Sequence, residues 1–310
     1  MTQSETGNVG SPGPLAEDEQ RSSAAAEHLE ERPPAPDVDI TKPHVARMYD
    51  YYLGGKHNYA VDREAAEQML KLFPQGRIAA RMNRRFLIES VRWMAQEAGI
   101  RQFLDIGSGL PTQQNVHEVA QAVDPDARVV YVDNDPLVRV HAEALLATEP
   151  NTIFLTGNLC EPEDLINRPE LREHLDLSRP VGLLLVSVLH CVEDDDQAQR
   201  IVKTLSDALP SGSYVAISHA LQDESTKEQW AKGREIYQRA QASGRVRTRE
   251  EITALFTGLT PVGCGVVHIS EWTPPEGSPA FEGGGNVVSL DDPDVVKTVP
   301  IMCGIARIDR

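Results

Sequence analysis

The period of the apolar positions changes near residue 100 of the chain. Before that point it is helical. Apolar residues fall at an i, i+3, i+4, i+7 spacing on one helix face, at Val45, Met48, Tyr49 and Tyr52. That helix is predicted to end at Gly54 and Gly55. Two more helices are predicted, one capped by Asp62 and running to Leu72, and one over 78–98.

Short β-branched runs alternate with helical segments from residue 101 to residue 220. Strands are predicted at 102–106, 128–133, 152–156, 181–188 and 213–218, and helices at 115–123, 136–147, 162–174 and 198–208. The run VGLLLVSV at 181–188 is apolar without interruption, as parallel strands covered on both faces tend to be. The alternation predicts an α/β fold with a doubly wound, mostly parallel sheet.

The two ends of the chain differ from this pattern. Residues 1–40 are acidic, rich in Pro, Ser and Ala and poor in large apolar residues, which predicts a disordered tail. Beyond residue 220, helices are predicted near 226–242 and from Thr248, and strands over 262–272 and 301–308. Segment 274–300, rich in Gly, Pro and Asp, is expected to be a long loop or a β-hairpin insertion.

One domain over 41–310 is therefore expected after the tail. In it, 41–100 forms an N-terminal helical cover, 101–220 is the cofactor-binding core, and 221–310 adds C-terminal helices and strands.

Charge and composition exclude several classes of protein. The chain has 30 basic and 47 acidic residues, a formal net charge of −17, which argues against general binding to nucleic acids or anionic membranes. No apolar run approaches the roughly 18 residues of a membrane span, and no basic-then-apolar leader is present. The four cysteines lie far apart without a C-x-x-C pair, so we expect reduced thiols, no metal site and a cytoplasmic location.

The strongest chemical signal is a glycine turn at the end of the first predicted strand. Asp105 precedes the turn formed by Gly107, Ser108 and Gly109, and the chain then enters a helix. A dinucleotide fingerprint needs a third glycine where this chain has Thr112. Asp133 ends the next strand, where a carboxylate can accept both hydroxyls of a ribose. A ligand with an aminoacyl end and a ribose but no phosphate is S-adenosylmethionine (SAM).

Several longer stretches make a family resemblance recognisable. From about Lys42 onward, and more weakly across 274–300, the chain resembles the actinobacterial S-adenosyl methyltransferase family, formerly a domain of unknown function. The stretches that carry the resemblance are 46–59 (ARMYDYYLGGKHNY), 80–87 (ARMNRRFL), 102–112 (QFLDIGSGLPT), 115–120 (NVHEVA) and 129–136 (VVYVDNDP).

The resemblance implies a class I methyltransferase fold, which is Rossmann-like, with SAM as its cofactor. It places SAM on the glycine turn, Asp133 and Asn134, and Asn158 with Leu159 beside the adenine. Class I methyltransferases usually have an aspartate where this chain has Asn158, whose amide oxygen can accept without charge assistance. The expected cofactor-binding residues are Asp105, Gly107, Ser108, Gly109, Asp133, Asn134, Asn158, Leu159 and Ser187.

Candidates for catalysis and for acceptor binding lie outside this set. His190 follows the fourth strand and could act as a general base, because the ordinary pKa of histidine is near neutral; a structural role is the alternative. His219 is a weaker second candidate. Tyr52 is a further catalytic candidate, since an aromatic face near a sulfonium adds a cation–π contribution. The candidates for lid or acceptor contacts are Tyr52, Gly54, Gly55, Lys56, Asn58, Tyr59, Arg81 and Asn83.

The sequence thus predicts a SAM-dependent methyltransferase that transfers a methyl group by in-line displacement. A small-molecule acceptor is expected, while the methylated atom (O, N or C) and the oligomeric state stay open. Two alternatives remain: a non-catalytic SAM-binding regulatory protein and, with less support, an NAD(P)-dependent oxidoreductase.

Overall fold

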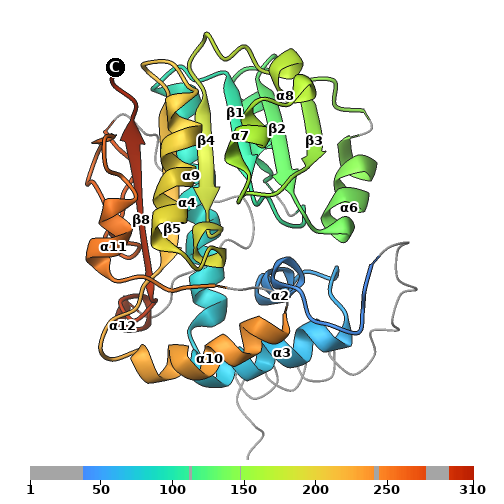
Figure 1. Cartoon of the computed structure of the whole chain (residues 1–310), viewed down its shortest axis with the longest axis vertical. Coiled ribbons are helices and arrows are strands. Elements are labelled where there is room, and N and C mark those ends of the chain that lie inside the picture. Colours follow the sequence, from blue (N-terminus) through green and yellow to red (C-terminus); the bar gives the residue numbers. More distant parts are fainter. Residues whose placement is uncertain (1–37, 112–113, 147, 241–243, 277–292) are drawn as a thin grey trace, which may run out of the picture. The chain divides into compact units, whose positions relative to one another are not determined.

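A mixed sheet forms the centre of the fold in the computed structural model, which describes residues 38–111, 114–146, 148–240, 244–276 and 293–310 (Figure 1). These residues belong to the compact unit Ala35–Arg310. The strand order is β3 (Thr152–Thr156), β2 (Arg128–Asp133), β1 (Gln102–Ile106), β4 (Gly182–Val186), β5 (Tyr214–Ala220), β8 (Ile301–Arg307) and β6 (Thr260–Pro261), and β7 (Val267–His268) also pairs with β8. The first five strands are parallel and β8 is antiparallel to β5, which confirms the doubly wound, mostly parallel sheet.

Helices cover both faces of the sheet, so successive strand residues are buried on opposite sides. On one face Leu104 packs with α7 (Pro162–Ile166), α8 (Pro169–His174) and α9 (Asp195–Asp207). On the other face Phe103 packs with α4 (Gly76–Gln96) and α5 (Val116–Gln121). Of the remaining helices near the sheet, α6 (Pro136–Leu146) follows β2, and α11 (Arg249–Ala254) buries Ile252 against Met302 of β8. Burial on both faces explains the uninterrupted apolar character of the strands.

Three helices lie beyond the carboxyl ends of the parallel strands (Figure 1). They are α2 (Val45–Tyr52), α3 (Ala60–Leu72) and α10 (Lys227–Arg239), which share a separate apolar cluster that includes Met48, Met69 and Ile236. This arrangement confirms a helical cover from the N-terminal region, although α4, the third helix of 41–100, packs on a face of the sheet instead. It also adds α10, which comes from the other end of the chain.

The start of the cover depends on Asp62. The helix predicted to be capped by Asp62 begins at Ala60 with Tyr59 as its N-cap residue, and Asp62 caps it from the first turn as part of a capping box. From there its Oδ2 accepts the N–H of Tyr59 at 2.8 Å and its Oδ1 accepts the N–H of His44 at 2.9 Å. One buried carboxylate therefore ties the beginning of α3 to the beginning of α2.

Three sequence predictions differ from the structure. The strand predicted over 262–272 is wrong apart from β7, because Gly263 and Gly265 have φ of +61° and +78° and turn the chain. The helix predicted over 162–174 is two helices, which separate at Asn167. Within 274–300, α12 (Pro293–Val296) was not predicted. The predictions for residues 1–37 and 277–292 lie outside the described residues.

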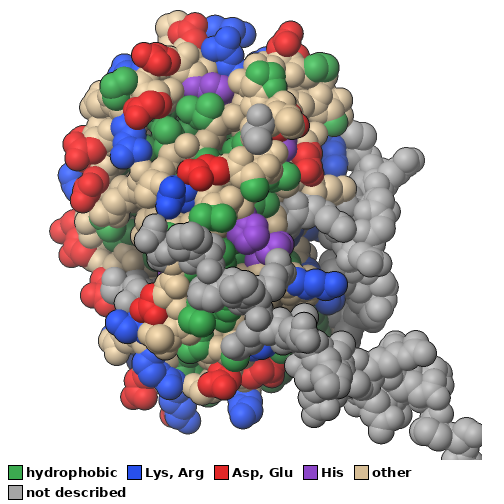
Figure 2. Space-filling model, turned by 90° about the vertical axis from the view of Figure 1, so that its right-hand side faces the viewer, with side chains coloured by type: hydrophobic (Ala, Val, Ile, Leu, Met, Phe, Trp, Pro, Cys, Tyr) green, Lys and Arg blue, Asp and Glu red, His purple; other side chains and the backbone are tan. Residues whose placement is uncertain are grey.

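The surface carries mixed charge. On the face in Figure 2, acidic and basic side chains are interspersed and hydrophobic side chains are scattered. Among the described residues, Leu145 is the large hydrophobic side chain that is exposed. None of the described helices has both the length and the apolar character needed to cross a membrane.

Candidate functional site

A cavity of about 770 Å³ lies where the carboxyl ends of the parallel strands meet α2, α3 and α10. Its floor is formed by the segments that follow β1, β2, β3 and β4. Because β1 and β4 are neighbours whose chains continue to opposite sides, a crevice at this point is expected in a doubly wound sheet. All nine predicted cofactor-binding residues line this cavity: Asp105, Gly107, Ser108, Gly109, Asp133, Asn134, Asn158, Leu159 and Ser187.

The glycine turn after β1 has a backbone conformation that residues other than glycine rarely adopt. Gly107 and Gly109 have φ of +73° and +67°. A Cβ on Gly107 would also lie 2.3 Å from Cγ2 of Val188. The N–H groups of Gly107 and Ser108 donate to the carbonyl of Val132 at 2.8 and 3.2 Å, which ties the turn to β2. Glycine is therefore required at position 107, both because φ is positive there and because Val188 leaves no room for a Cβ.

Two carboxylates border the turn. Asp133 is buried, and its Oδ2 and Oδ1 accept the N–H groups of Gly109 and Asp135 at 2.8 and 2.9 Å. A carboxylate oxygen has two lone-pair sites, so each oxygen can accept one more hydrogen bond. Burial raises the pKa of Asp133, while the two backbone hydrogen bonds oppose this.

Asp105 is the second of these carboxylates. It is 4% exposed, and it accepts no hydrogen bond from any residue that the structure describes. Burial raises its pKa to about 7, and the positive charge of Arg84 opposes this shift. A ligand that brings N–H donors or positive charge would satisfy this carboxylate.

Ser187 closes the end of β4 in a strained conformation. Its φ is +55°, in the left-handed region that favours glycine. Its N–H donates to the carbonyl and to Oγ of Ser218 at 3.1 and 3.0 Å. Oγ of Ser218 donates to Asn83 at 2.5 Å, and Asn83 donates to the hydroxyl of Tyr49 at 3.0 Å. This chain of hydrogen bonds links the end of β4 to α4 and α2 across the cavity.

The adenine end of the expected site lies after β3. Asn158 accepts the N–H of Cys160 through Oδ1 at 3.0 Å and donates through Nδ2 to Glu161 at 3.1 Å. These two hydrogen bonds orient the amide, so its oxygen has one lone-pair site left for a ligand amino group.

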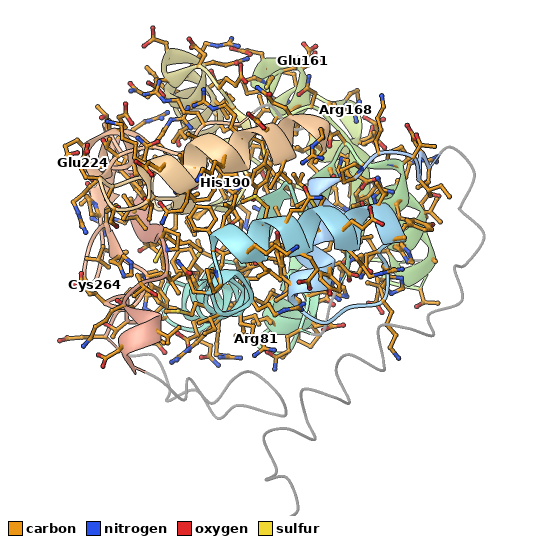
Figure 3. All side chains as sticks on the ribbon, turned by 90° about the horizontal axis from the view of Figure 1, so that it is seen from below. Arg81, Glu161, Arg168, His190, Glu224 and Cys264 are labelled. Carbon is orange, nitrogen blue, oxygen red and sulfur yellow. The ribbon has the colours of Figure 1, made fainter. Side chains whose placement is uncertain are left out.

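His190 lies on the 3₁₀ turn η1 (Leu189–Cys191) and lines the cavity behind α10 in the view of Figure 3. Its Nδ1 is buried and has no hydrogen-bond partner in the described part of the chain. Burial, followed by the positive charge of Arg247, lowers its pKa to about 4. The ring is therefore neutral near pH 7 and a weaker base than an ordinary histidine.

Arg247, which is 1% exposed, holds the turn of His190 in place. Its guanidinium donates to the carbonyls of Leu189 and Val192 at 3.0 and 2.9 Å and pairs with Asp195 at 2.9 Å. It also lies 2.9 Å from Nε2 of His219. Because an arginine side chain can only donate, Nε2 of His219 must accept this hydrogen bond. The other ring nitrogen of His219, Nδ1, then carries the proton and donates to the carbonyl of Ala220 at 2.7 Å. His219 is fully buried and does not line the cavity.

The predicted lid and acceptor residues fall into two groups. Tyr52 and Asn83 line the cavity. The loop residues Gly54, Gly55, Lys56, Asn58 and Tyr59 are not among its lining, and neither is Arg81, which lies on the exposed side of α4 (Figure 3). The loop folds onto the carboxylate of Asp50, which accepts the N–H of His57 and the amide of Asn58, each at 2.8 Å. The loop therefore braces α2 beside the cavity.

Several lining residues were missed by sequence reasoning. They are Phe73, Trp230 and Tyr237, together with His44, whose Nδ1 lies 2.8 Å from Oδ2 of Asp135. The helical spacing of Trp230 and Tyr237, which are seven residues apart, was the one available signal. Among the described residues no group of three or more His, Cys, Asp or Glu side chains could hold a metal ion.

Comparisons with known proteins agree with this geometry. The family model described as S-adenosyl methyltransferase matches residues 31–309. A crystal structure of a DUF574 family protein from Streptomyces avermitilis is 37% identical, with a TM-score of 0.77, and the match covers 87% of this chain and 99% of that one. A candidate methyltransferase from Thermobifida fusca is 41% identical, with a TM-score of 0.78, and the match covers 89% and 99% of the two chains. No curated protein matches the sequence.

Proposed function

The chain belongs to the S-adenosyl methyltransferase family, and from this premise we propose that the cavity at the strand ends holds SAM on its floor and a small-molecule acceptor under its helical cover. The protein is a SAM-dependent methyltransferase. When bound, SAM supplies an electrophilic methyl group on a sulfonium. What the chain has to provide is binding, orientation and exclusion of water.

The two carboxylates carry the proposal for the cofactor. Asp133 keeps one lone-pair site on each oxygen, which suits the two hydroxyls of a ribose. Asp105, without a hydrogen-bond partner among the described residues, suits the ammonium of the methionyl group. The N–H groups and bare Cα atoms of the glycine turn allow the ligand to approach the backbone. The residues on the floor of the cavity therefore fit SAM.

The size of the cavity and the helices that enclose it support a small-molecule acceptor. A cavity of about 770 Å³ lies in the upper part of the ~300–1,000 Å³ range of small-molecule sites. Packing of α2, α3 and α10 over this cavity limits the access of macromolecules. On the face shown in Figure 2, the interspersed charges form no basic patch of the kind that nucleic-acid-binding proteins use.

Alignment is the main catalytic contribution that we assign to the chain. Oriented reactant pairs reach effective molarities of about 10⁵–10⁸ M, so holding an acceptor atom in line with the methyl group supplies much of the rate. With its pKa lowered to about 4, His190 is proposed to orient a hydroxyl or amine as a neutral hydrogen-bond acceptor. Tyr52 is proposed to contact the acceptor from α2.

A comparison of two nucleosides tests the ribose assignment. Adenosine should bind the wild-type protein about 100-fold more tightly than 2′,3′-dideoxyadenosine, from two hydrogen bonds of about 1.5 kcal/mol each to a charged group. Calorimetry on Asp133→Asn should find this preference reduced to less than about tenfold, because the amide offers a single uncharged acceptor. The control, Asp124→Asn, changes a surface carboxylate that pairs with Arg101 and should keep the preference. Equal preferences in wild type and Asp133→Asn would refute the assignment.

A further inference from the structure

The wall of the cavity opposite the strand ends is lined by aromatic rings. Tyr52 comes from α2, Phe73 follows α3, and Trp230 and Tyr237 lie seven residues apart on α10. We call these four residues the aromatic chamber. The helices that carry them lie side by side below the sheet (Figures 1 and 3). Flat rings from three helices form a surface suited to a flat apolar ligand.

Contacts within the protein hold two rings of the chamber, Phe73 and Trp230. Phe73 and Trp230 are in contact, with ring centroids 4.3 Å apart and planes inclined by 39°. Nε1 of Trp230 donates to the carbonyl of Leu221 at 3.0 Å, which fixes the orientation of the indole. A preformed aromatic wall reduces the entropy lost when a planar ligand binds.

Two hydroxyls in the chamber have no hydrogen-bond partner in the part of the chain that the structure describes. Tyr49 and Tyr51 donate to the carbonyl of Ala80 and to Glu67, at 3.0 and 2.6 Å. The hydroxyls of Tyr52 and Tyr237 make no such bond with any described residue, and both residues line the cavity. Burial raises the pKa of Tyr237 to about 12, with a further contribution from Cys191, the neighbour of His190. Both phenols therefore stay protonated and can donate to a ligand oxygen.

The charges around the chamber favour one class of ligand over another. The two ionisable residues of α10 that line the cavity, besides Tyr237, are the cations Lys227 and Arg234, and no carboxylate of α3 or α10 is among the described lining residues. Of the other lining carboxylates, Asp105 and Asp133 lie across the cavity at the strand ends, and Asp50 on α2 already accepts the N–H of His57 and the amide of Asn58. A neutral or anionic substituent is compatible with this wall, whereas an ammonium would lack a counter-ion there.

We propose that the aromatic chamber binds the methyl acceptor, and that this acceptor is a planar aromatic compound with a phenolic hydroxyl and no cationic group. The inference rests on the proposed function, since it assigns the chamber to the acceptor of the same site. The hydroxyls of Tyr52 and Tyr237 donate to the phenolic oxygen, which favours the phenolate because hydrogen bonds to a charged form stabilise it. Transfer then forms an O–CH₃ bond as the S–CH₃ bond breaks. The electron pair of that bond stays on sulfur, and the phenolic proton passes to solvent.

Naphthalene compounds are matched probes for the chamber. Each is titrated calorimetrically into the full chain saturated with S-adenosylhomocysteine. 2-Naphthol and 6-hydroxy-2-naphthoic acid should bind, and 2-naphthylmethylamine should bind at least about tenfold more weakly, because its ammonium is desolvated without a counter-ion. Decahydro-2-naphthol, which keeps the hydroxyl and loses the flat ring, should also bind more weakly than 2-naphthol. Equal affinities for 2-naphthol and 2-naphthylmethylamine, or for 2-naphthol and decahydro-2-naphthol, would overturn the proposed class of acceptor.

A second titration tests the hydrogen bond between the Tyr237 hydroxyl and the hydroxyl of the ligand. In wild type, 2-naphthol should bind more tightly than 2-methylnaphthalene, and Tyr237→Phe should reduce that difference by about three- to tenfold while leaving 2-methylnaphthalene unchanged. Tyr51→Phe removes a hydroxyl bonded to Glu67 outside the cavity and should change neither affinity. If Tyr237→Phe weakens both ligands equally, or neither, the hydrogen-bonding role is wrong.

Failure of this inference is distinct from failure of the proposed function. If S-adenosylhomocysteine binds and none of the naphthalene probes does, the aromatic acceptor is refuted and the cofactor site stands. If S-adenosylhomocysteine itself does not bind the folded chain, the proposed function fails, and this inference fails with it.

Discussion

Protonation of Asp105 should control cofactor affinity near neutral pH. In the ligand-free protein its carboxyl has a pKa of about 7, because it is buried and the charge of Arg84 only partly compensates. A ligand ammonium placed against this carboxyl would favour the ionised form and lower that pKa. Binding should therefore release a proton, and affinity should rise with pH until Asp105 is already ionised in the free protein.

The size of the effect follows from this pKa. At pH 7 about half of the free protein carries the proton, so binding of S-adenosylhomocysteine should release about 0.5 proton. Below that pH the affinity should fall about tenfold per unit, which amounts to about 30-fold between about pH 8 and about pH 5.5. Calorimetry in buffers with different ionisation enthalpies measures the protons released, and the dissociation constants measure the affinity.

Two variants isolate the contribution of Asp105. Asp105→Asn should bind weakly at every pH and lose most of the pH dependence, while Asp124→Asn, on the surface, should keep the wild-type profile. In the free protein the raised pKa also makes folding stability fall as pH rises from about 4 through 7, because the folded state holds the proton more tightly than the unfolded chain does. Asp105→Asn should therefore be the more stable protein at about pH 8. A pH-independent wild-type affinity would refute the placement of the ammonium at Asp105.

Three further substitutions test the rest of the site. His190→Gln should lower turnover and leave the affinity for S-adenosylhomocysteine unchanged, and wild type should show no inflection near pH 6.5 from this residue, whose pKa is about 4; an inflection that the variant abolishes would contradict its neutral role. Arg247→Met should reduce the free energy of unfolding by about 3–5 kcal/mol, because it leaves Asp195 and buried carbonyls without their partner; an unchanged urea midpoint would contradict this. Gly107→Ala, whose Cβ would meet a valine methyl at 2.3 Å, should lose cofactor binding, whereas Gly258→Ala, with positive φ but open space, should retain it; equal effects would point to backbone strain alone.

The parallel sheet and the candidate cofactor-binding residues at its carboxyl-terminal edge could be predicted because local sequence determines them. An apolar run, a glycine turn and a terminal carboxylate identify the ends of β1 and β2 without any knowledge of distant contacts. The switch in winding direction between β1 and β4 then brings Asp105, Asp133 and Ser187 to one cavity. Pattern and topology together were sufficient there.

Features that depend on contacts between distant segments could not be predicted in this way. The sequence predicts a helix near 226–242, but not that this helix packs beside α3 and places Trp230 against Phe73. The ordinary near-neutral pKa that suggested His190 as a base is changed by burial and by Arg247, which is 57 residues away in the chain. In 262–272 the β-branched residues suggested a strand, while Gly263 and Gly265 adopt turns that divide it.

A crystal structure of the full chain with S-adenosylhomocysteine tests the central claim most directly. The ribose hydroxyls should lie within hydrogen-bond distance of both oxygens of Asp133, with the amino group at Asp105 and the sulfur facing Tyr52 and Tyr237 of the aromatic chamber. A ligand bound elsewhere, or one whose sulfur points away from that chamber, would contradict it.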